Sequence, residues 1–161
     1  MFGVPEAAMN EWMSSLLEYL ASQPDVVAAY IFGSVARGQA RPQSDVDIAV
    51  LLSADLDEET RFDRRLRLGW EAERVIGRPT DLVVLNDAPP LLQHQVLKHG
   101  HLIFERDRAA RVEFEVRAGQ IYADLKPMYD FFTAVLFKEI REVGLGGRRR
   151  RDRRKVDVPA E

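Results

Sequence analysis

Apolar residues follow two different periods along the chain, and these periods predict its secondary structure. Three segments, residues 26–32, 45–52 and 81–85, are apolar at nearly every position. Such runs predict β-strands covered on both faces, as at the centre of an α/β sheet. Before the first strand, apolar residues recur at steps of three and four, which predicts an amphipathic helix over residues 6–20. Its apolar stripe consists of Met9, Met13, Leu16, Leu17 and Leu20.

A second helix is predicted between the second and third strands. Residues 58–76 combine many charged positions with a helical repeat of large apolar ones, and residues 77–79 (Gly-Arg-Pro) end the pattern. The apolar positions, which we expect to form the buried stripe of this helix, are Phe62, Leu66, Trp70 and Ile76. The arginine and glutamate residues between them then form a solvated face.

The chain after the third strand is predicted to be mostly helical. Asp87 is expected to cap a short helix that ends at Gly100, and residues 102–104 to form a short edge strand. A helical repeat then continues from residue 108 to 142. Because Pro127 falls inside it, a kink or a division into two helices is expected near Leu125 and Lys126. The apolar positions of this repeat are Ala118, Ile121, Leu125, Met128, Phe132 and Leu136.

This order of elements predicts a small three-layer α/β domain with a compact sheet and a long C-terminal helical segment. A length of 161 residues fits one domain with a tail better than two domains. We expect the domain to span residues 1–143. Residues 144–161 are rich in glycine and arginine, which predicts a disordered tail.

Composition narrows the functional classes. With 46% apolar and 30% charged residues, the chain is expected to be folded. It contains no cysteine, which excludes disulfides, thiolate metal sites and a cysteine nucleophile. No apolar run approaches the ~20 residues of a membrane-spanning helix. We therefore expect a cytoplasmic protein without a membrane partner.

Charge is distributed unevenly along the chain. The net charge is −3, but residues 148–161 hold seven basic and three acidic residues (+4), so the first 147 residues sum to −7. An acidic body is not typical of a dedicated nucleic-acid-binding domain. The run from Arg148 to Lys155 could contact RNA or an acidic partner, but a solvated, disordered end is the favoured interpretation.

The segment between the first two strands contains candidate phosphate-binding residues. Gly33 follows the first strand, and Ser34 begins a short helical turn whose free backbone N–H groups suit a phosphate. The Ser34 hydroxyl adds a donor, and Arg37 is near enough in sequence to add positive charge. These residues predict a phosphate-binding turn.

Acidic residues stand at the start of two predicted strands. Asp45 and Asp47 are two positions apart, so their side chains point to the same face about 7 Å apart. Asp81 begins the next strand. Carboxylates on apolar strands need compensation, and their hard oxygen atoms favour Mg²⁺ or Mn²⁺. If the strands are neighbours, the three acids can hold two metal ions at a phosphoryl-transfer site, with Asp81 nearest the attacking hydroxyl.

These residues resemble the signature of minimal nucleotidyltransferases in the DNA polymerase β-like superfamily. That signature is a Gly-Ser pair followed after ten residues by Asp-x-Asp, here within GSVARGQARPQSDVDIAV (residues 33–50). Further stretches resemble the MntA-type antitoxins in particular. They are TDLVVLN (80–86), the Lys98-His99-Gly100 helix end, and FEVRAGQIYADLKP (114–127). The resemblance covers about residues 10–140.

The resemblance implies a fold, an activity and a partner. MntA-type proteins use ATP and Mg²⁺ to attach AMP to a tyrosine of a HEPN-domain ribonuclease toxin, HepT, and so silence it. For this chain it implies a nucleotidyltransferase-type domain with a mixed sheet, ATP as co-substrate, two Mg²⁺ (or Mn²⁺) ions and a cognate HEPN toxin. The implied catalytic metal ligands are Asp45, Asp47 and Asp81. The implied nucleotide-binding residues are Gly33, Ser34, Arg37 and Ser44.

Two other functions fit the same motif. One is a nucleotidyltransferase acting on a small molecule such as an aminoglycoside, although 161 residues leave little room for an acceptor domain. The other is an antitoxin that inhibits by binding alone. The sequence identifies neither an element that reads the nucleotide base nor the acceptor residue.

The histidines and the C-terminal aromatic residues have structural interpretations. His94, His99 and His101 are expected to pack or to contact carbonyl groups rather than to bind a metal, because two of them flank a helix end. The aromatic residues are expected to be buried in the core or in an interface. They are Tyr122, Tyr129, Phe131, Phe132 and Phe137.

Overall fold

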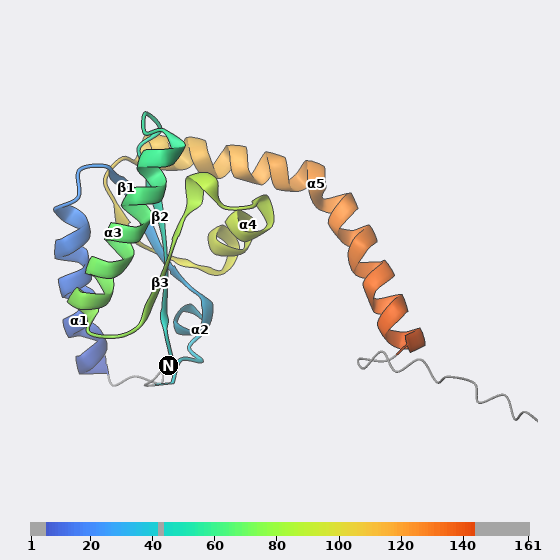
Figure 1. The fold of residues 1–161 in the computed structure, drawn as a ribbon, viewed down its shortest axis with the longest axis horizontal. Helices are drawn as coiled ribbons and strands as arrows, with labels where there is room; N and C mark the ends of the chain where they lie inside the picture. The colour runs from blue at the N-terminus through green and yellow to red at the C-terminus, as the bar shows by residue number, and fades with distance from the viewer. Residues whose placement is uncertain (1–5, 42–43, 144–161) are drawn as a thin grey trace, which may run out of the picture. The chain divides into compact units, whose positions relative to one another are not determined.

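The fold follows the predicted order of helices and strands (Figure 1). A computed structural model describes residues 6–41 and 44–143. Its elements are α1 (Glu6–Ala21), β1 (Val26–Phe32), α2 (Gly33–Ala36), β2 (Val46–Leu52), α3 (Glu58–Ile76), β3 (Thr80–Val84), the 3₁₀ helix η1 (Leu85–Asp87), α4 (Pro90–His99), β4 (His101–Glu105) and α5 (Arg108–Val143). The predicted tail, residues 144–161, lies outside the described residues.

The four strands form one mixed sheet in the order β3-β2-β1-β4. β2 and β3 are parallel, whereas β1 runs antiparallel to both β2 and β4. Helices α1 and α3 cover one face of this sheet, and α4 with the beginning of α5 covers the other (Figure 1). The predicted three-layer architecture and the edge position of β4 are therefore confirmed.

The central strands β1 and β2 contribute side chains to both faces of the sheet, because successive residues of a strand point to opposite sides. Ile31 and Ile48 pack in the core under α1 and α3. Tyr30 and Ala49 pack in the core on the other side, with Val96 of α4. This double burial explains why both strands are apolar along their length.

The predicted buried stripe of α3 is wrong for three of its four residues. The exposed side chains are Phe62, Leu66 and Trp70, with exposed fractions of 56%, 57% and 65%, and the buried ones are Leu68, Ala72 and Ile76. This rotation places the smaller side chains against the sheet and lets two arginines of the helix reach distant acids. Arg61 pairs with Asp87, and Arg64 donates to Asp25.

The predicted cap of α4 is also wrong, although its end is confirmed. Asp87 is the last residue of η1 and accepts hydrogen bonds from Arg61, while Pro89 precedes the first turn of α4 without a side-chain cap. Gly100 ends the helix. A Cβ atom there would lie 2.5 Å from the carbonyl oxygen of Val96, so glycine permits this close approach.

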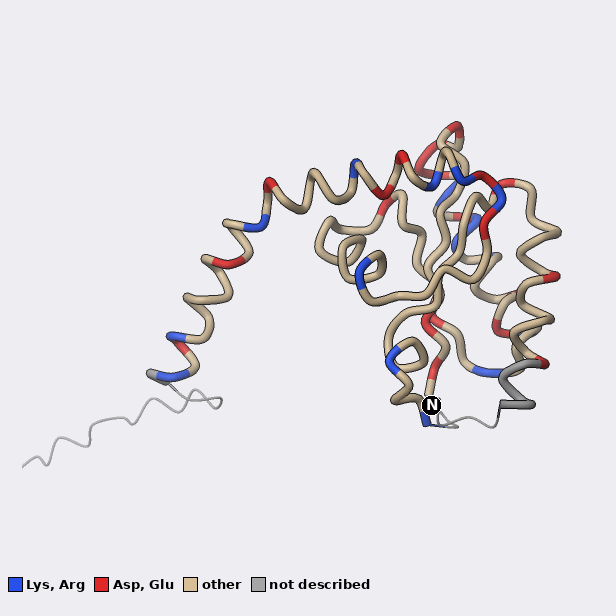
Figure 2. The backbone as a smooth tube through the Cα atoms, turned by 180° about the vertical axis from the view of Figure 1, so that it is seen from behind, with Lys and Arg blue, Asp and Glu red and all other residues tan. Residues whose placement is uncertain are grey.

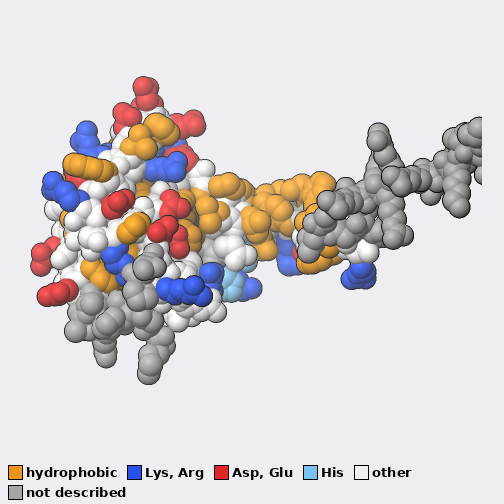
Figure 3. Space-filling view, turned by 60° about the horizontal axis from the view of Figure 1, so that its bottom comes forward, with side chains coloured by type: hydrophobic (Ala, Val, Ile, Leu, Met, Phe, Trp, Pro, Cys, Tyr) orange, Lys and Arg blue, Asp and Glu red, His pale blue; other side chains and the backbone are white. Residues whose placement is uncertain are grey.

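Helix α5 continues through Pro127, so the chain does not leave the helix there, and the kink stays a prediction. By its internal contacts the chain divides into two compact units, Met1–Tyr122 and Ala123–Glu161. Core burial of the aromatic group is wrong for Phe131, Phe132 and Phe137, which are 64%, 60% and 59% exposed. Figure 3 shows hydrophobic side chains over much of the visible surface of this helix.

The apolar repeat of α5 is buried only in part, and the predicted interface role of the aromatic residues stays a prediction. Ala118 is buried, whereas the exposed members are Ile121, Met128, Phe132 and Leu136. None of the helices within residues 6–41 and 44–143 is long and apolar enough to cross a membrane.

Candidate functional site

Gly33 and Asp47 lie against each other where β1 ends. Asp47 pairs in antiparallel register with Phe32, the last residue of β1. Gly33 follows with φ +66°, in the left-handed region that favours glycine. A Cβ atom at residue 33 would overlap the Oδ2 atom of Asp47 and lie 2.9 Å from its Cγ. Glycine is therefore required here both for its backbone conformation and for the space that Asp47 occupies.

Helix α2 is a single turn that begins at this glycine. The Arg37 N–H donates to the carbonyl of Gly33 at 3.2 Å, and the Gln39 N–H donates to that of Ser34 at 2.9 Å. His101 at the start of β4 lies with Nε2 3.0 Å from the carbonyl oxygen of Ala36. The expected carbonyl contact of this histidine is confirmed, although the carbonyl belongs to α2 rather than to α4.

The acidic residues lie at the amino ends of β2 and β3. Asp47 is paired with Asp81 in the parallel register, so the two side chains leave the same face of neighbouring strands. Asp45 lies just before β2 and is exposed, as is Asp81, whereas Asp47 is half-buried. In Figure 2, acidic positions at the start of the strands and a basic position just after α2 lie at the same end of the sheet.

The pKa of Asp47 is raised above its ordinary value of 3.8. Burial is the main cause, and the nearby carboxylates of Asp81 and Asp45 add to it. Arg37 and a hydrogen bond from the Ser34 backbone act in the opposite direction. Asp47 is thus electrostatically coupled to two other acids on one side and to the α2 turn on the other.

Arg78 contacts Arg41 and Ser44, which precede Asp45, a role that the sequence did not suggest. Its guanidinium donates to the carbonyl of Ser44 at 2.7 Å and to that of Arg41 at 3.4 Å. The Ser44 hydroxyl in turn accepts from the Arg41 N–H at 2.9 Å. In the sequence, Arg78 stands between Gly77 and a proline and was interpretable only as part of a helix stop.

The acidic residues fit a hard divalent cation by their chemistry, since carboxylate oxygens are the ligands that Mg²⁺ prefers. A cation would also offset the burial and the neighbouring carboxylates that together raise the pKa of Asp47. They are not gathered as a ready ligand set. Within the described ranges, 6–41 and 44–143, no group of three or more His, Asp or Glu residues is placed to hold an ion.

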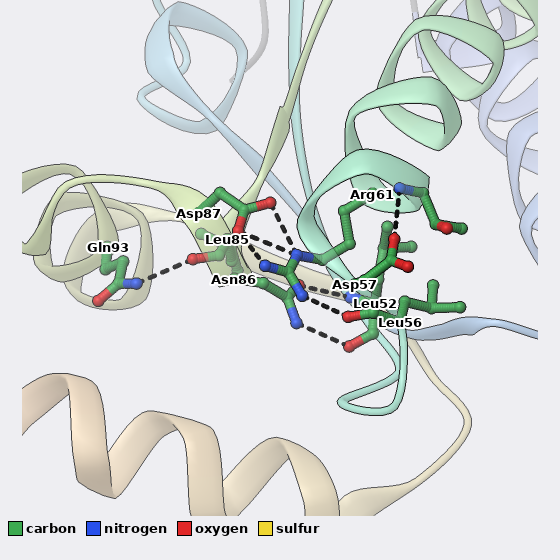
Figure 4. Close-up of polar contacts among 9 residues, drawn as sticks. Leu52, Leu56, Asp57, Arg61, Leu85, Asn86, Asp87 and Gln93 are labelled. Atoms are coloured by element: carbon green, nitrogen blue, oxygen red, sulfur yellow. Dashed lines mark hydrogen bonds and ion pairs between the residues drawn. The ribbon is translucent and has the colours of Figure 1, made fainter.

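The other end of the sheet holds a separate polar cluster (Figure 4). Arg61 binds the Asp87 carboxylate through Nε at 2.8 and 2.9 Å and through Nη2 at 2.6 Å. Asn86 bridges both backbone groups of Leu52 at 2.9 Å, and Gln93 donates to the carbonyl of Leu85. These bonds satisfy backbone groups where β2 and β3 end, so we assign them a structural role.

A cavity of about 320 Å³ opens at this same end, bordered by Phe62, Arg65 and Val84. None of the acids Asp45, Asp47 and Asp81 borders it.

His94 packs against an aromatic ring of α5. It stacks on Tyr122 with ring centroids 3.6 Å apart. Its packing interpretation is confirmed.

Comparisons with known proteins agree with this geometry. Residues 14–109 match the polymerase beta nucleotidyltransferase family. A protein of Methanocaldococcus jannaschii, inferred to be a protein adenylyltransferase, is 36% identical over 72 residues, or 45% of this chain and 73% of the relative. The protein adenylyltransferase MntA of Shewanella oneidensis is 29% identical over 103 residues, which cover 64% of this chain and 70% of that protein. A chain in a crystal structure of a toxin–antitoxin with AMP-PNP superposes with a TM-score of 0.65 at 25% identity, covering 78% of this chain and 98% of that one.

Proposed function

Because the chain belongs to the polymerase beta nucleotidyltransferase family, we propose that it is an antitoxin that transfers AMP from ATP to a tyrosine of a cognate HEPN-domain ribonuclease toxin. The tyrosine oxygen attacks the α-phosphorus of ATP, the bond to pyrophosphate breaks, and the hydroxyl proton leaves. The products are AMP-tyrosine and pyrophosphate. Modification of the toxin then neutralises it.

One observation supports the proposal most directly. The Asp47 carboxylate lies against the Gly33–Ser34 turn and, through the register of β2 and β3, next to Asp81. The turn that we propose to bind phosphates and the acids that we propose to bind cations are thereby adjacent. Transfer of a nucleotidyl group requires this juxtaposition, because the reacting phosphate must lie between them.

The triphosphate would bind at the α2 turn. Gly33 begins the turn with φ +66°, the Ser34 hydroxyl would donate a hydrogen bond to a phosphate, and the exposed Arg37 guanidinium would add positive charge. Ser44 would act from the loop, since its hydroxyl already accepts from the Arg41 N–H and can donate its own proton to an oxygen of the nucleotide.

Asp45, Asp47 and Asp81 would hold Mg²⁺. When bound, Mg²⁺ supplies positive charge that offsets the charge developing on the transferring phosphate and the leaving pyrophosphate. Asp81 is exposed at the edge strand β3, where an acceptor protein can approach, and would take the proton from the tyrosine hydroxyl.

The acceptor is proposed from the relatives. Two proteins of similar sequence are named as protein adenylyltransferases, one of them MntA, and a toxin–antitoxin structure with AMP-PNP shares the fold.

Intact-mass spectrometry of the cognate HEPN toxin tests the proposal. The toxin encoded beside this chain is incubated with it, ATP and Mg²⁺, and we expect mass gains in units of AMP. Asp45→Asn and Asp47→Asn should abolish the gain. Asp124→Asn, an exposed aspartate of α5, is the matched control and should preserve it.

Other results would favour the alternative functions. Co-purification of the two proteins without any mass gain would indicate an antitoxin that inhibits by binding. Absence of both gain and association, together with pyrophosphate release in the presence of an aminoglycoside, would indicate a small-molecule nucleotidyltransferase.

A further inference from the structure

Helix α3 presents an apolar stripe that neither the core nor the candidate site uses. Phe62, Leu66 and Trp70 succeed one another at four-residue steps and are 56%, 57% and 65% exposed. The stripe lies wholly within the unit Met1–Tyr122. A row of large exposed side chains on one helix is typical of an interaction surface rather than of scattered surface residues.

The stripe runs beside the free edge of the sheet. Arg65 of α3 donates to the carbonyl of Leu82 on β3 at 3.3 Å, and β3 has only β2 as a neighbour among the described strands. Phe62 borders the cavity of about 320 Å³ described above, and Trp70 borders a second of about 350 Å³ next to Pro79. Each end of the stripe therefore adjoins a hollow that can receive a side chain.

The charges of α3 separate into used and unused ones. Arg61, Arg64 and Arg65 make the intramolecular contacts described above. The other charged residues of α3 are in no ion pair within residues 6–41 and 44–143; they are Glu58, Glu59, Asp63, Arg67, Glu71, Glu73 and Arg74. Among them, Asp63 and Arg74 are of opposite charge and flank the apolar stripe. They are eleven residues apart, which is about three helical turns, so they lie on the same side of the helix about 16 Å from each other.

We propose that α3 binds α3 of a second copy of this chain in antiparallel orientation. Leu66 of each copy packs against Trp70 of the other, and Asp63 of each pairs with Arg74 of the other. The midpoint between Leu66 and Trp70 along the helix is residue 68, and the midpoint between Asp63 and Arg74 lies between residues 68 and 69. One two-fold axis near residue 68 therefore forms all of these pairs at once.

Charge complementarity selects this occupant and this orientation. In a parallel pair, Asp63 would face Asp63 and Arg74 would face Arg74, and like charges in contact are unfavourable. Arg74 already lies over the Trp70 ring, 5.6 Å from its centroid. It is therefore held beside the apolar stripe, where the acid of a second copy would arrive.

Sedimentation equilibrium of the complete chain, without toxin, tests the pairing. We expect a species of twice the 18.4 kDa chain mass. Leu66→Glu should give monomers. Asp63→Arg alone and Arg74→Asp alone should each weaken dimerisation at least about tenfold, because each creates two like-charge contacts. The double variant Asp63→Arg/Arg74→Asp should restore the wild-type affinity to within about threefold.

Matched controls separate this result from misfolding. Leu91→Glu, at a 41% exposed leucine of α4, should leave the dimer intact, and all variants should keep the wild-type circular dichroism spectrum.

Two results for the pairing would overturn the proposal: a wild-type chain that is monomeric, or a double variant that dimerises no better than the single variants. So would a Leu66→Glu variant that stays dimeric. If the wild-type chain is monomeric and Leu66→Glu loses binding to the toxin, the stripe is a toxin surface instead. AMP transfer is measured separately, so failure of the dimer leaves the proposed activity testable.

Discussion

The Asp47 carboxylate occupies the space that a side chain on Gly33 would need, with Cγ 2.9 Å from the position of the absent Cβ. This contact connects the turn after β1 to the acidic end of β2, two segments separated by the whole loop of residues 37–45. A phosphate bound at the turn and a cation bound at the acid would therefore be held at a fixed separation. Substitution at either residue should alter both functions.

Gly33→Ala should reduce both activity and stability. The left-handed backbone at φ +66° costs about 1–2 kcal/mol for a residue with a Cβ, and the new methyl group must displace the Asp47 carboxylate. We expect AMP transfer to fall about 100-fold, since a displacement of about 1 Å at a catalytic group can have that effect. Urea denaturation and toxin mass spectrometry measure the two quantities.

Gly77→Ala is the matched control for this substitution. Gly77 ends α3 with φ +71°, but a Cβ atom there would have no neighbour within 4 Å. It should therefore lose about 1–2 kcal/mol of stability from backbone strain and keep its activity. Equal activity losses in the two variants would show that the contact with Asp47 has no special role.

Asp47→Asn should stabilise the protein at neutral pH while abolishing transfer. The raised pKa of Asp47 means that the folded state binds a proton more tightly than the unfolded state. The free energy of unfolding therefore falls as pH rises from the ordinary value of 3.8 through the folded pKa, and stays lower above it. Asparagine cannot ionise, so the variant avoids this loss, whereas transfer should fall more than about 100-fold.

Thermal unfolding across pH, with and without Mg²⁺, checks this prediction. Asp47→Asn should melt above the wild type at pH 7, and the difference should disappear well below pH 3.8. Mg²⁺ should raise the melting temperature of the wild type more than that of the variant. A variant that is less stable than the wild type at pH 7 would contradict the electrostatic account.

Much of the site follows from local sequence, because strand periodicity determines which side chains share a face. Asp47 and Asp81 each begin an apolar strand, and adjacency of these strands is sufficient to bring the two acids together. The approach of Gly33 to Asp47 depends on the antiparallel register of β1 and β2, which no local pattern specifies. Arg78 was missed for a similar reason, since its carbonyl partners Arg41 and Ser44 are 37 and 34 residues away.

Helix α3 illustrates the opposite outcome, because its boundaries were predicted correctly and its orientation was not. Two rows at four-residue steps compete for the core, one with Phe62 and Trp70 and one with Leu68 and Ala72. Hydrophobicity favours the larger side chains. The ion pair of Arg61 with an acid 26 residues away helps to set the rotation that buries the smaller ones. Periodicity in the sequence contains no information about such pairs.

Arg78→Ala should loosen the loop before Asp45. The substitution removes the guanidinium from two carbonyls, at 2.7 and 3.4 Å, and hydrogen bonds to charged groups are worth about 1.5–3 kcal/mol. We expect a stability loss of about that size and a transfer rate lower by about tenfold, because Asp45 directly follows the loosened Ser44. Arg108→Ala, at an exposed arginine, should change neither quantity. Normal transfer by Arg78→Ala would remove the loop from the mechanism.

The pair of Arg61 and Asp87 should contribute to stability and not to catalysis. Their side chains are 18% and 36% exposed and are joined by a two-pronged contact at the end of the sheet opposite the acids (Figure 4). In a double-mutant cycle, Arg61→Ala and Asp87→Ala should show a coupling of about 1–2 kcal/mol. Arg61→Ala should be the more destabilising single change, because Arg61 also donates to the carbonyl of Leu56. The coupling should shrink in 1 M NaCl, where exposed ion pairs are screened.

The two single variants and the double variant should all transfer AMP at the wild-type rate. Additive stability losses would mean that the pair is incidental, and a lower transfer rate would mean that this end of the sheet takes part in the reaction.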